Sequence, residues 1–494
     1  MALDQSVNQR FSSRTGLLLS ALGIAVGTGN IWRFPRIAAQ NGGDEGAGAL
    51  IIAWITFLFL WSIPLIIAEY LIGKRHRSGV VSAFAKGMGQ RYAWMGAFVA
   101  FVATAISFFY AIIVGWSLYY FFQMVINPLP ADSTTSLALW DNFQEGYLPF
   151  ITHFLAVVAG IFAISKGVKS IEKVNKILIP VLLIIILIAV FRAITLPGAG
   201  DGIAYLFRPQ WSQLKDPNIW LQALTQNAWD TGAGWGLFLT YAAYMKIEHG
   251  SVKNAFITGI GNNIISLLMA IMIFGTVFSV MQSGMGYSDT EVLDVMRNSG
   301  PASTGLTFIW MPQLFGMMSF GKPLAALFFL GLAFAGFSSL ISMFELTTRV
   351  LVDKGIKRKK ALWIVVGTAY VLGIPSAMSL DILANQDFVW GLGLIISGIF
   401  IALHALKYGL DKFKTRDLLS ANDWKLGKWW NYLLRNFIPV GGVILLLWWM
   451  YLSATQFAPE NWYNPLNPFS VMTCVLQWGV VTSLFVFYNR WYSL

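Results

Sequence analysis

The sequence predicts an all-α polytopic membrane protein of about twelve spans, built as two inverted five-helix repeats with unwound first and sixth spans. Three observations lead to this fold class. The chain is 56% hydrophobic and only 12% charged. Its apolar runs are long enough to cross a bilayer, and two of them, five spans apart, are interrupted by glycines. Backbone polar groups cannot stay bare in hydrocarbon, so paired breaks predict a polar site at mid-membrane.

Apolar runs bounded by charged and turn-forming residues define the expected spans. These lie at residues 16–39, 48–73, 94–126, 149–165, 174–194, 218–245, 252–283, 322–353, 361–377, 387–407, 432–455 and 468–490. The longest external segments are expected at 127–148, 195–217 and 284–321, the last of them re-entering as a lid. The expected organisation is a cytoplasmic segment 1–15, a first repeat 16–194, an extracellular loop 195–217, a second repeat 218–407, and a final part 408–494 with two spans and a short cytoplasmic C-terminus.

Basic residues gather in alternate loops, and this asymmetry predicts the orientation of the chain. Clusters follow the second, fourth and eighth spans, and comprise Lys74, Arg75, Arg77, Lys86 and Arg91, then Lys166, Lys169, Lys173 and Lys176, then Lys354, Lys357, Arg358, Lys359 and Lys360. By the positive-inside rule these loops and both termini are cytoplasmic. The first residues lack a signal-peptide pattern, so the first span should be retained. No N-x-S/T acceptor occurs, which favours a prokaryotic plasma membrane, and the net charge of +11 requires no nucleic acid.

The first span is interrupted within SALGIAVGTGNIWRFPRIAAQNGG, residues 20–43. Its apolar helix runs into glycines at 27 and 29, and then presents Asn30, Arg33 and Pro35 at membrane depth. Such glycines can simply let two helices pack closely. They can also mark an unwound segment whose carbonyls and amides face a ligand.

The sixth span carries the second break, within QNAWDTGAGWG, residues 226–236. Asp230 and glycines at 232, 234 and 236 stand in the middle of a membrane-length segment. An ionisable residue at that depth is a functional candidate by default. The neighbouring predicted spans offer no Lys or Arg at the same depth for a structural ion pair. Together the two breaks favour an inverted-repeat transporter with a midplane site.

Other functional classes have less support. The four histidines, at positions 76, 153, 249 and 404, are scattered, and no H-E-x-x-H, G-x-S-x-G or phosphate loop points to an enzyme. The single cysteine, Cys474, lies in an apolar run and offers neither a disulfide nor a cysteine-based metal site. A channel is a rival, because broken helices also build selectivity filters. A sensor that binds its ligand without accumulating it is another.

Several motifs stand in order along the chain: GTGNIWRFP in the first span, NGG after it, IPLIIAEYLIGK ending the second, SKGVKSIEKVNKILIP entering the fifth, FAGFSSLISMFE in the eighth and DFVWG opening the tenth. They resemble the neurotransmitter:sodium symporter family, whose structural archetype is the bacterial leucine transporter. The resemblance covers nearly the whole chain. It implies the leucine-transporter-type fold and alternating access, with spans one, two, six and seven rocking against spans three, four, eight and nine.

The resemblance also implies two sodium sites built from oxygen atoms beside the breaks. One would use the carbonyls of Gly23, Val26 and Ala335 with the hydroxyls of Ser338 and Ser339. The other would use oxygens of Ala25, Asn30, Asp230 and Asn262. From the residues alone, the two serines could bond back to their own helix, and the two asparagines could bridge helices.

The implied substrate is an amino acid held at both charged ends. The amides of Thr28 and Gly29 begin the resumed helix and suit a carboxylate, which Tyr110 would also bind, although a tyrosine in a span is otherwise a packing residue. The amine would meet carbonyls near Ala25, Trp229 and Asp230. The side-chain pocket would be lined by Ile24, Ile106, Trp229, Gly232, Trp235, Ser339 and Met343. Amine-transporting members carry an Asp at the position of Gly27, so glycine favours a substrate with its own carboxylate.

Gates on both sides are implied in the same way. Arg33 and Asp387 match an extracellular pair, with Trp229 as an aromatic lid, and Tyr244 and Asp353 match the cytoplasmic gate. A charge near the end of a span otherwise snorkels to the interface. The arginine that completes the inner gate in the family falls on Asn8, with Arg10 nearby, which leaves the inner latch without a matching partner.

Asp230 is the main departure from the family, which has Thr or Ser there. The positions equivalent to the chloride site are Trp54, Gln226, Asp230 and Ser266, and Trp54 replaces the expected tyrosine. Two opposite charges ~4 Å apart attract by roughly 4 kcal/mol at an effective dielectric of 20. We therefore expect Asp230 to replace chloride as the counter-charge of sodium, and it could also return a proton.

The resulting expectation is a sodium-coupled amino-acid importer, a monomer or dimer in the bilayer, that does not require chloride. The alternative is that Asp230 contacts the substrate directly and selects a non-standard amine or amino-acid derivative.

Overall fold

The computed structural model describes residues 9–298, 304–415, 418–420 and 423–489, and within these ranges it contains helices and no strands. The spans are formed by α1 (Arg14–Ala25), η2 (Gly29–Arg33) and α2 (Phe34–Asn41); α3 (Gly48–Phe57), η3 (Leu58–Ser62) and α4 (Ile63–His76); α6 (Ala93–Ile126); α8 (Leu148–Ile164); α9 (Val168–Ile194); α11 (Pro217–Asp230) and α12 (Leu237–Ala242); α13 (Val252–Met285); α16 (Gly321–Asp353); α17 (Arg358–Met378); α18 (Leu380–Tyr408); α19 (Lys428–Tyr432), η9 (Leu433–Phe437), α20 (Ile438–Leu452) and η10 (Ser453–Phe457); and α21 (Val471–Phe487). The expectation of an all-α membrane fold is confirmed.

Within the described residues, eight helices are long and apolar enough to cross a membrane, and the number rises to ten if each of two sharply bent pairs is one span. One of those pairs is the first span, bent by 52° between α1 and the following η2–α2. The helices α21 and α11–α12 are shorter, so their crossing remains a prediction. The fifth, tenth and eleventh spans begin several residues earlier than expected, at Val168, Leu380 and Lys428.

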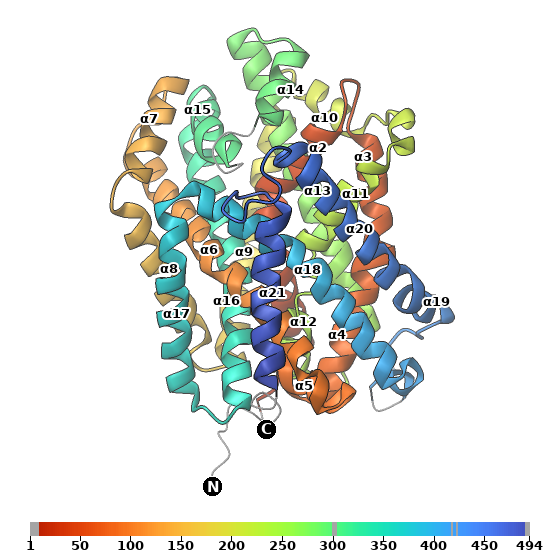
Figure 1. The fold of residues 1–494 in the computed structure, drawn as a ribbon. Helices are drawn as coiled ribbons and strands as arrows, with labels where there is room; N and C mark the ends of the chain where they lie inside the picture. Colours follow the sequence, from red (N-terminus) through yellow and green to blue (C-terminus); the bar gives the residue numbers. More distant parts are fainter. Residues whose placement is uncertain (1–8, 299–303, 416–417, 421–422, 490–494) are drawn as a thin grey trace.

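The connecting helices lie at the two ends of the bundle. They are α5 (Val80–Met88), η4 (Gln90–Tyr92), α7 (Ser133–Gln144), α10 (Ala199–Phe207), η5 (Trp211–Lys215), α14 (Asp289–Arg297), η7 (Leu306–Trp310), α15 (Met311–Gly316) and η8 (Leu410–Lys414). Figure 1 places α7, α10, α14 and α15 at one end and α5 at the other. The segment 284–321, expected as a lid, supplies α14 and α15 to the first of these ends, apart from residues 299–303, which lie outside the described residues.

Proline accounts for four π-helical turns in this fold. Pro35, Pro64, Pro312 and Pro439 each stand at the second position of the helix that directly follows a π-turn. Proline has no N–H, and its ring pushes away the carbonyl one turn earlier. The preceding hydrogen bonds therefore lengthen by one residue, which bends the span without breaking it.

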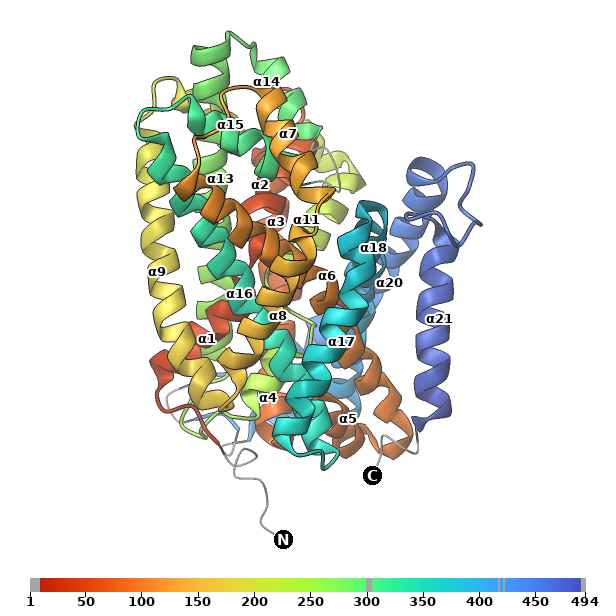
Figure 2. The ribbon, with the colours of Figure 1, turned by 90° about the vertical axis from the view of Figure 1, so that its left-hand side faces the viewer.

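The core of the bundle is organised around α6, a helix of 34 residues that is buried along most of its length. It packs against α16, α8 and α18. The helix α6 is apolar on all sides, which is typical of a helix buried in a protein core or in a membrane. Figure 2 shows α21 at the edge of the bundle, whereas α6 and α16 run through it. The two broken spans pack beside this framework, which fixes where their open ends face.

Candidate functional site

The first break lies between α1 and η2, where the backbone of Val26 turns to an extended conformation with ψ 97°. Two freed amides find side-chain partners. Gly27 N–H donates to Asn30 Oδ1 at 2.7 Å, and Thr28 N–H donates to the Tyr110 hydroxyl at 3.0 Å. Tyr110 is therefore tied to the start of the resumed helix, where an anionic group would also be favoured.

The second break lies between α11 and α12. Gly232, Gly234 and Gly236 have φ of 69°, 89° and 77°, a left-handed region that side-chain-bearing residues rarely adopt. The Glu69 carboxylate on α4 satisfies two of the freed amides, accepting from Gly234 N at 2.7 Å and from Leu239 N at 3.2 Å. Glu69 is fully buried. The glycines permit the break, and Glu69 stabilises it.

A small pocket lies between the two breaks, with a volume of about 20 Å³, which is close to the room needed by one water molecule. Its lining comprises Ile24, Ala25, Gly27, Gly29, Asn30, Tyr110, Trp229, Asp230, Gly232, Trp235, Ser339 and Met343. Two residues of the expected substrate site are placed elsewhere. Thr28 lines a second cavity, and Ile106 is buried in the core. The Trp229 and Trp235 rings meet edge to face at 5.5 Å, so an amino acid requires Trp229 to move.

Polar atoms from three helices, α1, α11 and α13, converge beside this pocket. The side-chain amide of Asn262 on α13 ends in one oxygen and one nitrogen, and one of these two atoms points at two backbone carbonyls. This atom lies 3.1 Å from the oxygens of both Ala25 and Asp230. Asn30 Nδ2 lies 2.8 Å from the same Asn262 atom and donates to Ser266 Oγ at 2.7 Å. With its nitrogen outward, the Asn262 amide donates to both carbonyls. With its oxygen outward, it completes a set of oxygens that needs a cation, the ligand type that hard cations prefer.

The residues of the other expected sodium site, Gly23, Val26, Ala335, Ser338 and Ser339, come from α1 and α16. The Ser339 hydroxyl on α16 lies 3.2 Å from the carbonyl oxygens of Gly23 and Ile24 and 3.5 Å from that of Val26. The neighbouring Ser338 bonds back to Ala335 O at 2.9 Å and reaches Val26 O at 3.4 Å. Back-bonding within α16 thus involves Ser338, whereas Ser339 faces the freed carbonyls of α1.

Asp230 is buried, and it forms no ion pair among the described residues. Ser266 Oγ donates to its Oδ2 at 3.4 Å, and Gln226, Trp54 and Asn262 also face the carboxylate. The residues at the four positions expected to form a chloride site therefore lie together, with Trp54, Gln226 and Ser266 around Asp230. A carboxyl group therefore lies where a chloride ion would be expected.

A cavity of about 500 Å³ lies on the other side of Trp229 and is lined by both Arg33 and Asp387. No ion pair within 4 Å joins these two residues in the described chain. The Arg33 guanidinium instead lies 4.5 Å from the centre of the Trp229 ring, a cation–π contact that steadies both side chains. Trp229 separates this cavity from the small pocket.

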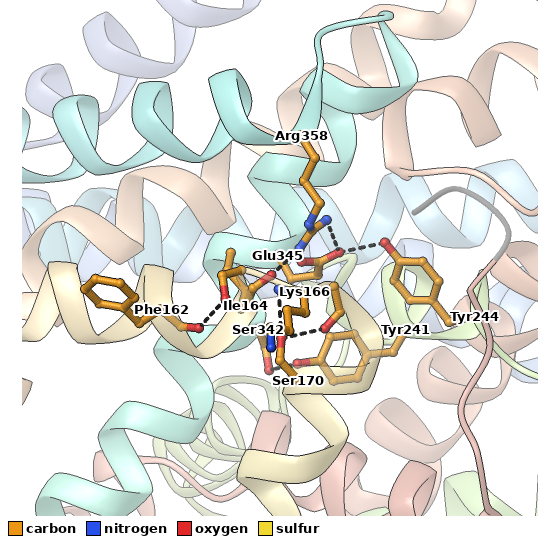
Figure 3. Close-up of polar contacts among 11 residues, drawn as sticks. Phe162, Ile164, Lys166, Ser170, Tyr241, Tyr244, Ser342, Glu345 and Arg358 are labelled. Atoms are coloured by element: carbon orange, nitrogen blue, oxygen red, sulfur yellow. Dashed lines mark hydrogen bonds and ion pairs between the residues drawn. The ribbon is translucent and has the colours of Figure 1, made fainter. Parts of the chain in front are cut away.

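The opposite side of the pocket is closed by a network of charged and hydroxyl groups (Figure 3). Arg358 at the start of α17 pairs with Glu345 of α16 at 2.5 Å and donates to Ile164 O at 2.6 Å. Tyr244 donates to the same Glu345 carboxylate at 2.6 Å, and the Tyr241 and Ser342 hydroxyls are 2.8 Å apart. The segment after α12 is thereby bound to α16 and, through α16, to α17.

Asp353 takes part in a second closure, with a partner that differs from the expected one. Arg349, one turn earlier on α16, pairs with it at 2.8 Å, and Gly79 N–H donates to it at 2.5 Å. Arg349 also faces the Tyr244 ring at 5.1 Å. Asn8 lies outside the described residues, and no ion pair joins Arg10 to Asp353 among the described ones. Among the described residues, the partners of Asp353 are therefore Arg349 of its own helix and the Gly79 amide.

A family model described as the sodium:neurotransmitter symporter family matches residues 8–146 and 146–493. The chain belongs to this family. An uncharacterised sodium-dependent transporter from Methanocaldococcus jannaschii is 32% identical over 451 residues, which cover 87% of this chain and 88% of that protein. A sodium- and chloride-dependent taurine transporter from Bos taurus is 26% identical, covering 97% of this chain and 83% of that protein.

Among solved structures, a crystal structure of MhsT in complex with L-phenylalanine matches with a TM-score of 0.76 and 29% identity. The match covers 89% of this chain and 99% of the other. It confirms the leucine-transporter-type fold that the motifs indicated. Members of this sodium:neurotransmitter symporter family are sodium-dependent transporters, and this chain is one of them.

Three residues of the site were not singled out from the sequence. Glu69, Glu345 and Arg358 are buried charged groups that stabilise the second break and close the pocket. Each glutamate stands inside a long apolar run, a pattern that by itself marks a functional candidate in a membrane protein. Arg358 was counted only among the loop charges that orient the chain.

Proposed function

We propose that this chain imports an amino acid together with sodium, across a prokaryotic plasma membrane with both termini in the cytoplasm. One observation carries the proposal: the Asn262 amide lies 3.1 Å from Ala25 O and 3.1 Å from Asp230 O, directly beside a pocket lined by both breaks. Carbonyls freed by the breaks bind cations, and the Thr28 amide with the Tyr110 hydroxyl binds a carboxylate. The MhsT complex with L-phenylalanine supports an amino acid as the substrate class.

In the proposed cycle, sodium and substrate enter through the 500 Å³ cavity and displace Trp229. Approach of Arg33 and Asp387 then closes that side. Loss of the Glu345 and Asp353 contacts opens the other. Because sodium and substrate sites share Ala25 and Asp230, each ligand stabilises the conformation that the other binds, which couples their movement.

The substrate class is tested by thermal shift of the purified protein against amino acids and related amines, with sodium and with choline. We expect stabilisation by an amino acid in sodium only. Uptake into proteoliposomes then separates a carrier from a sensor, which would bind without accumulation. Large single-channel currents would contradict a carrier.

We further propose that Asp230 replaces chloride as the counter-charge. Its burial beside the converging oxygens, with Ser266, Gln226 and Trp54 around it, supports this role. Uptake by the native protein should persist when chloride is exchanged for gluconate, whereas Asp230→Ser should require chloride. A strict chloride requirement in the native protein would contradict the proposal.

A second candidate role for Asp230 has its own support, because the residue also lines the central pocket. Direct contact with a cationic group would select an amine or amino-acid derivative. In that case Asp230→Ser would change which compounds stabilise the protein, and chloride would not restore the original preference.

A further inference from the structure

The helix α9 carries a row of exposed apolar side chains. Figure 2 shows this helix at the edge of the bundle. The side chains are between 46% and 68% exposed, and we call them the apolar stripe: Ile177, Ile184, Leu187, Ile188, Phe191 and Ile194. Their helical spacing places them on one side of α9. Because α9 is long and apolar enough to cross a membrane, the apolar stripe faces lipid acyl chains.

Three lysines continue this side of α9 at the end nearest the Glu345 network. Lys169, Lys173 and Lys176 stand four and three residues apart, so their side chains project from the same side of the helix. All three are exposed, and Ile177 follows directly after them. This side of α9 therefore changes from cationic to apolar within one turn, as a membrane does between its headgroups and its acyl chains.

A cavity of about 400 Å³ lies over the three lysines, and the start of the chain forms its other wall. It is lined by Arg10, Ser12, Lys169, Glu172, Lys173, Lys176 and Ile177. Pockets of this size hold small organic molecules. Because Ile177 belongs both to the cavity and to the apolar stripe, the cavity opens toward the lipid-facing side of α9.

The cavity holds more positive charge than its carboxylate balances. Glu172 supplies the only carboxylate among the described lining residues, and it pairs with Lys176 at 2.8 Å. It also accepts from Ser12 N at 2.7 Å and from Ser12 Oγ at 2.5 Å. Lys169 and Lys173 form no ion pair within the described parts of the chain. The excess of cations suits an anion with several acceptor oxygens, such as a phosphate group.

The opposite wall of the cavity is joined to the closed side of the central pocket. Arg10 lines the cavity, and the next residue, Phe11, is fully buried. Phe11 N–H donates to Tyr244 O at 3.1 Å, and the Phe11 ring lies 5.9 Å from the ring of Tyr241. An anion held by both Arg10 and the lysines would therefore tie this closed side to α9.

We propose that the cavity binds the headgroup of an anionic phospholipid, whose acyl chains lie along the apolar stripe. The phosphate oxygens accept from Lys169, Lys173 and Arg10, and each basic residue beside an anionic lipid adds to the attraction. A lipid also covers the apolar stripe, which a free phosphate does not. Bound in this way, the lipid bridges the start of the chain and α9 and stabilises the closed side. The site does not depend on which substrate or ion the chain carries.

The test is thermal unfolding of the purified full-length protein in a neutral detergent with three additives. They are short-chain phosphatidylglycerol, phosphatidylcholine with the same chains, and glycerol 3-phosphate. We expect stabilisation by phosphatidylglycerol alone, and choline chloride should weaken it by screening. Equal stabilisation by glycerol 3-phosphate would show a free-phosphate site and overturn the lipid. Equal stabilisation by phosphatidylcholine would show that the charge of the headgroup is not recognised, which also overturns the proposal.

The lysines of α9 are tested by the double variant Lys169→Gln/Lys173→Gln. The phosphatidylglycerol concentration for half-maximal stabilisation should rise by roughly thirtyfold, about fivefold for each lysine. The matched control is Lys359→Gln/Lys360→Gln, which removes two exposed lysines at the start of α17 and should keep the native value. An equal rise in the control, or no rise in the α9 variant, overturns the site. Where the double variant does not fold, the two single variants give the same comparison.

Two further variants test the other parts of the site. Arg10→Gln should raise the same concentration by about fivefold, and a native value would overturn the bridge to the start of the chain. Ile184→Asn places a polar group in the apolar stripe and should also weaken the effect of phosphatidylglycerol. Val371→Asn is its control, because Val371 is 58% exposed on α17, away from the stripe. Equal effects of these two substitutions would overturn the placement of the acyl chains.

Discussion

The two sides of the central pocket are built differently. On the side that the proposed orientation makes the outer one, Arg33 and Asp387 line a 500 Å³ cavity and form no ion pair among the described residues, and Arg33 rests on the Trp229 ring at 4.5 Å. On the inner side Arg358–Glu345 and Arg349–Asp353 pair at 2.5 Å and 2.8 Å. Buried pairs are costly to separate, whereas an aromatic contact can re-form elsewhere. The structure is therefore open on the side of Arg33 and Asp387 and closed on the side of Glu345 and Asp353.

The largest effect should come from breaking the inner lock at Glu345. In Glu345→Ala the carboxylate is lost to both Arg358 and Tyr244, so we expect the free energy of unfolding to fall by about 3–5 kcal/mol. Asp387→Ala is the outer counterpart and should cost less than about 1 kcal/mol, because its pair is not formed. Denaturant titration of both variants in detergent gives the comparison. Equal losses would show that the two sides do not differ.

The next effect concerns transport rather than stability. Asp387→Asn should reduce uptake by roughly tenfold or more. The outer side then closes without its charge pair, and each ~1.4 kcal/mol added to the barrier of that step slows it tenfold. Sodium-dependent stabilisation should persist, because Asp387 lies outside the oxygen cluster. Uptake and thermal shift on one preparation measure both. Native uptake would mean that the outer side closes without this pair.

A smaller effect is expected at Asp353. Asp353→Asn weakens the bond to Arg349 and leaves the Gly79 amide a neutral acceptor, a loss of about 1–2 kcal/mol. The population should shift toward the inward-open conformation without unfolding. A cysteine placed at Ser12 in a Cys474→Ser background should then react faster with a membrane-impermeant thiol reagent from the cytoplasmic side. Unchanged reactivity would place the inner lock at Glu345 alone.

The smallest effect is expected on the outer side, at the lid. A Cβ on Gly391 would lie 2.9 Å from Cζ3 of Trp229, so Gly391→Ala should displace the ring slightly and change substrate affinity by about two- to fivefold. Gly441→Ala is the control, because its Cβ would meet nothing within 4 Å. An effect as large as that of Asp387→Asn would show that Trp229, and not the charge pair, controls the outer side.

The two helix breaks could be predicted because glycines in the middle of a membrane span can be recognised in the sequence. Gly232, Gly234 and Gly236 sit in a span, and each takes the left-handed backbone that glycine permits. The resemblance to the family supplied the candidate ligands, including Asn262 and Ser339. Arg349 stands one helical turn before Asp353, a spacing that favours an ion pair within α16, whereas the family pattern implies a partner near the N-terminus. Glu345 and Arg358 lie on two different helices, 13 residues apart, so helical spacing could not predict that they pair.

Cavity sizes could not be predicted, because they depend on where rigid groups of helices stand and not on which residues line them. The same twelve lining residues would surround 20 Å³ or a volume that holds an amino acid, according to the position of Trp229. The separation of Arg33 from Asp387 has the same origin. Sequence motifs identify the two members of a gate, whereas the conformation decides whether they touch.

The Glu69 carboxylate has a mechanical consequence. By accepting from Gly234 and Leu239, it replaces the missing turn of the sixth span with bonds to a different helix, α4. The short helix α12 is consequently a rigid extension of the second span, and the glycines beside it act as a flexible joint. Any tilt of α4 carries α12 along as a lever, so both would swing together when the inner side opens.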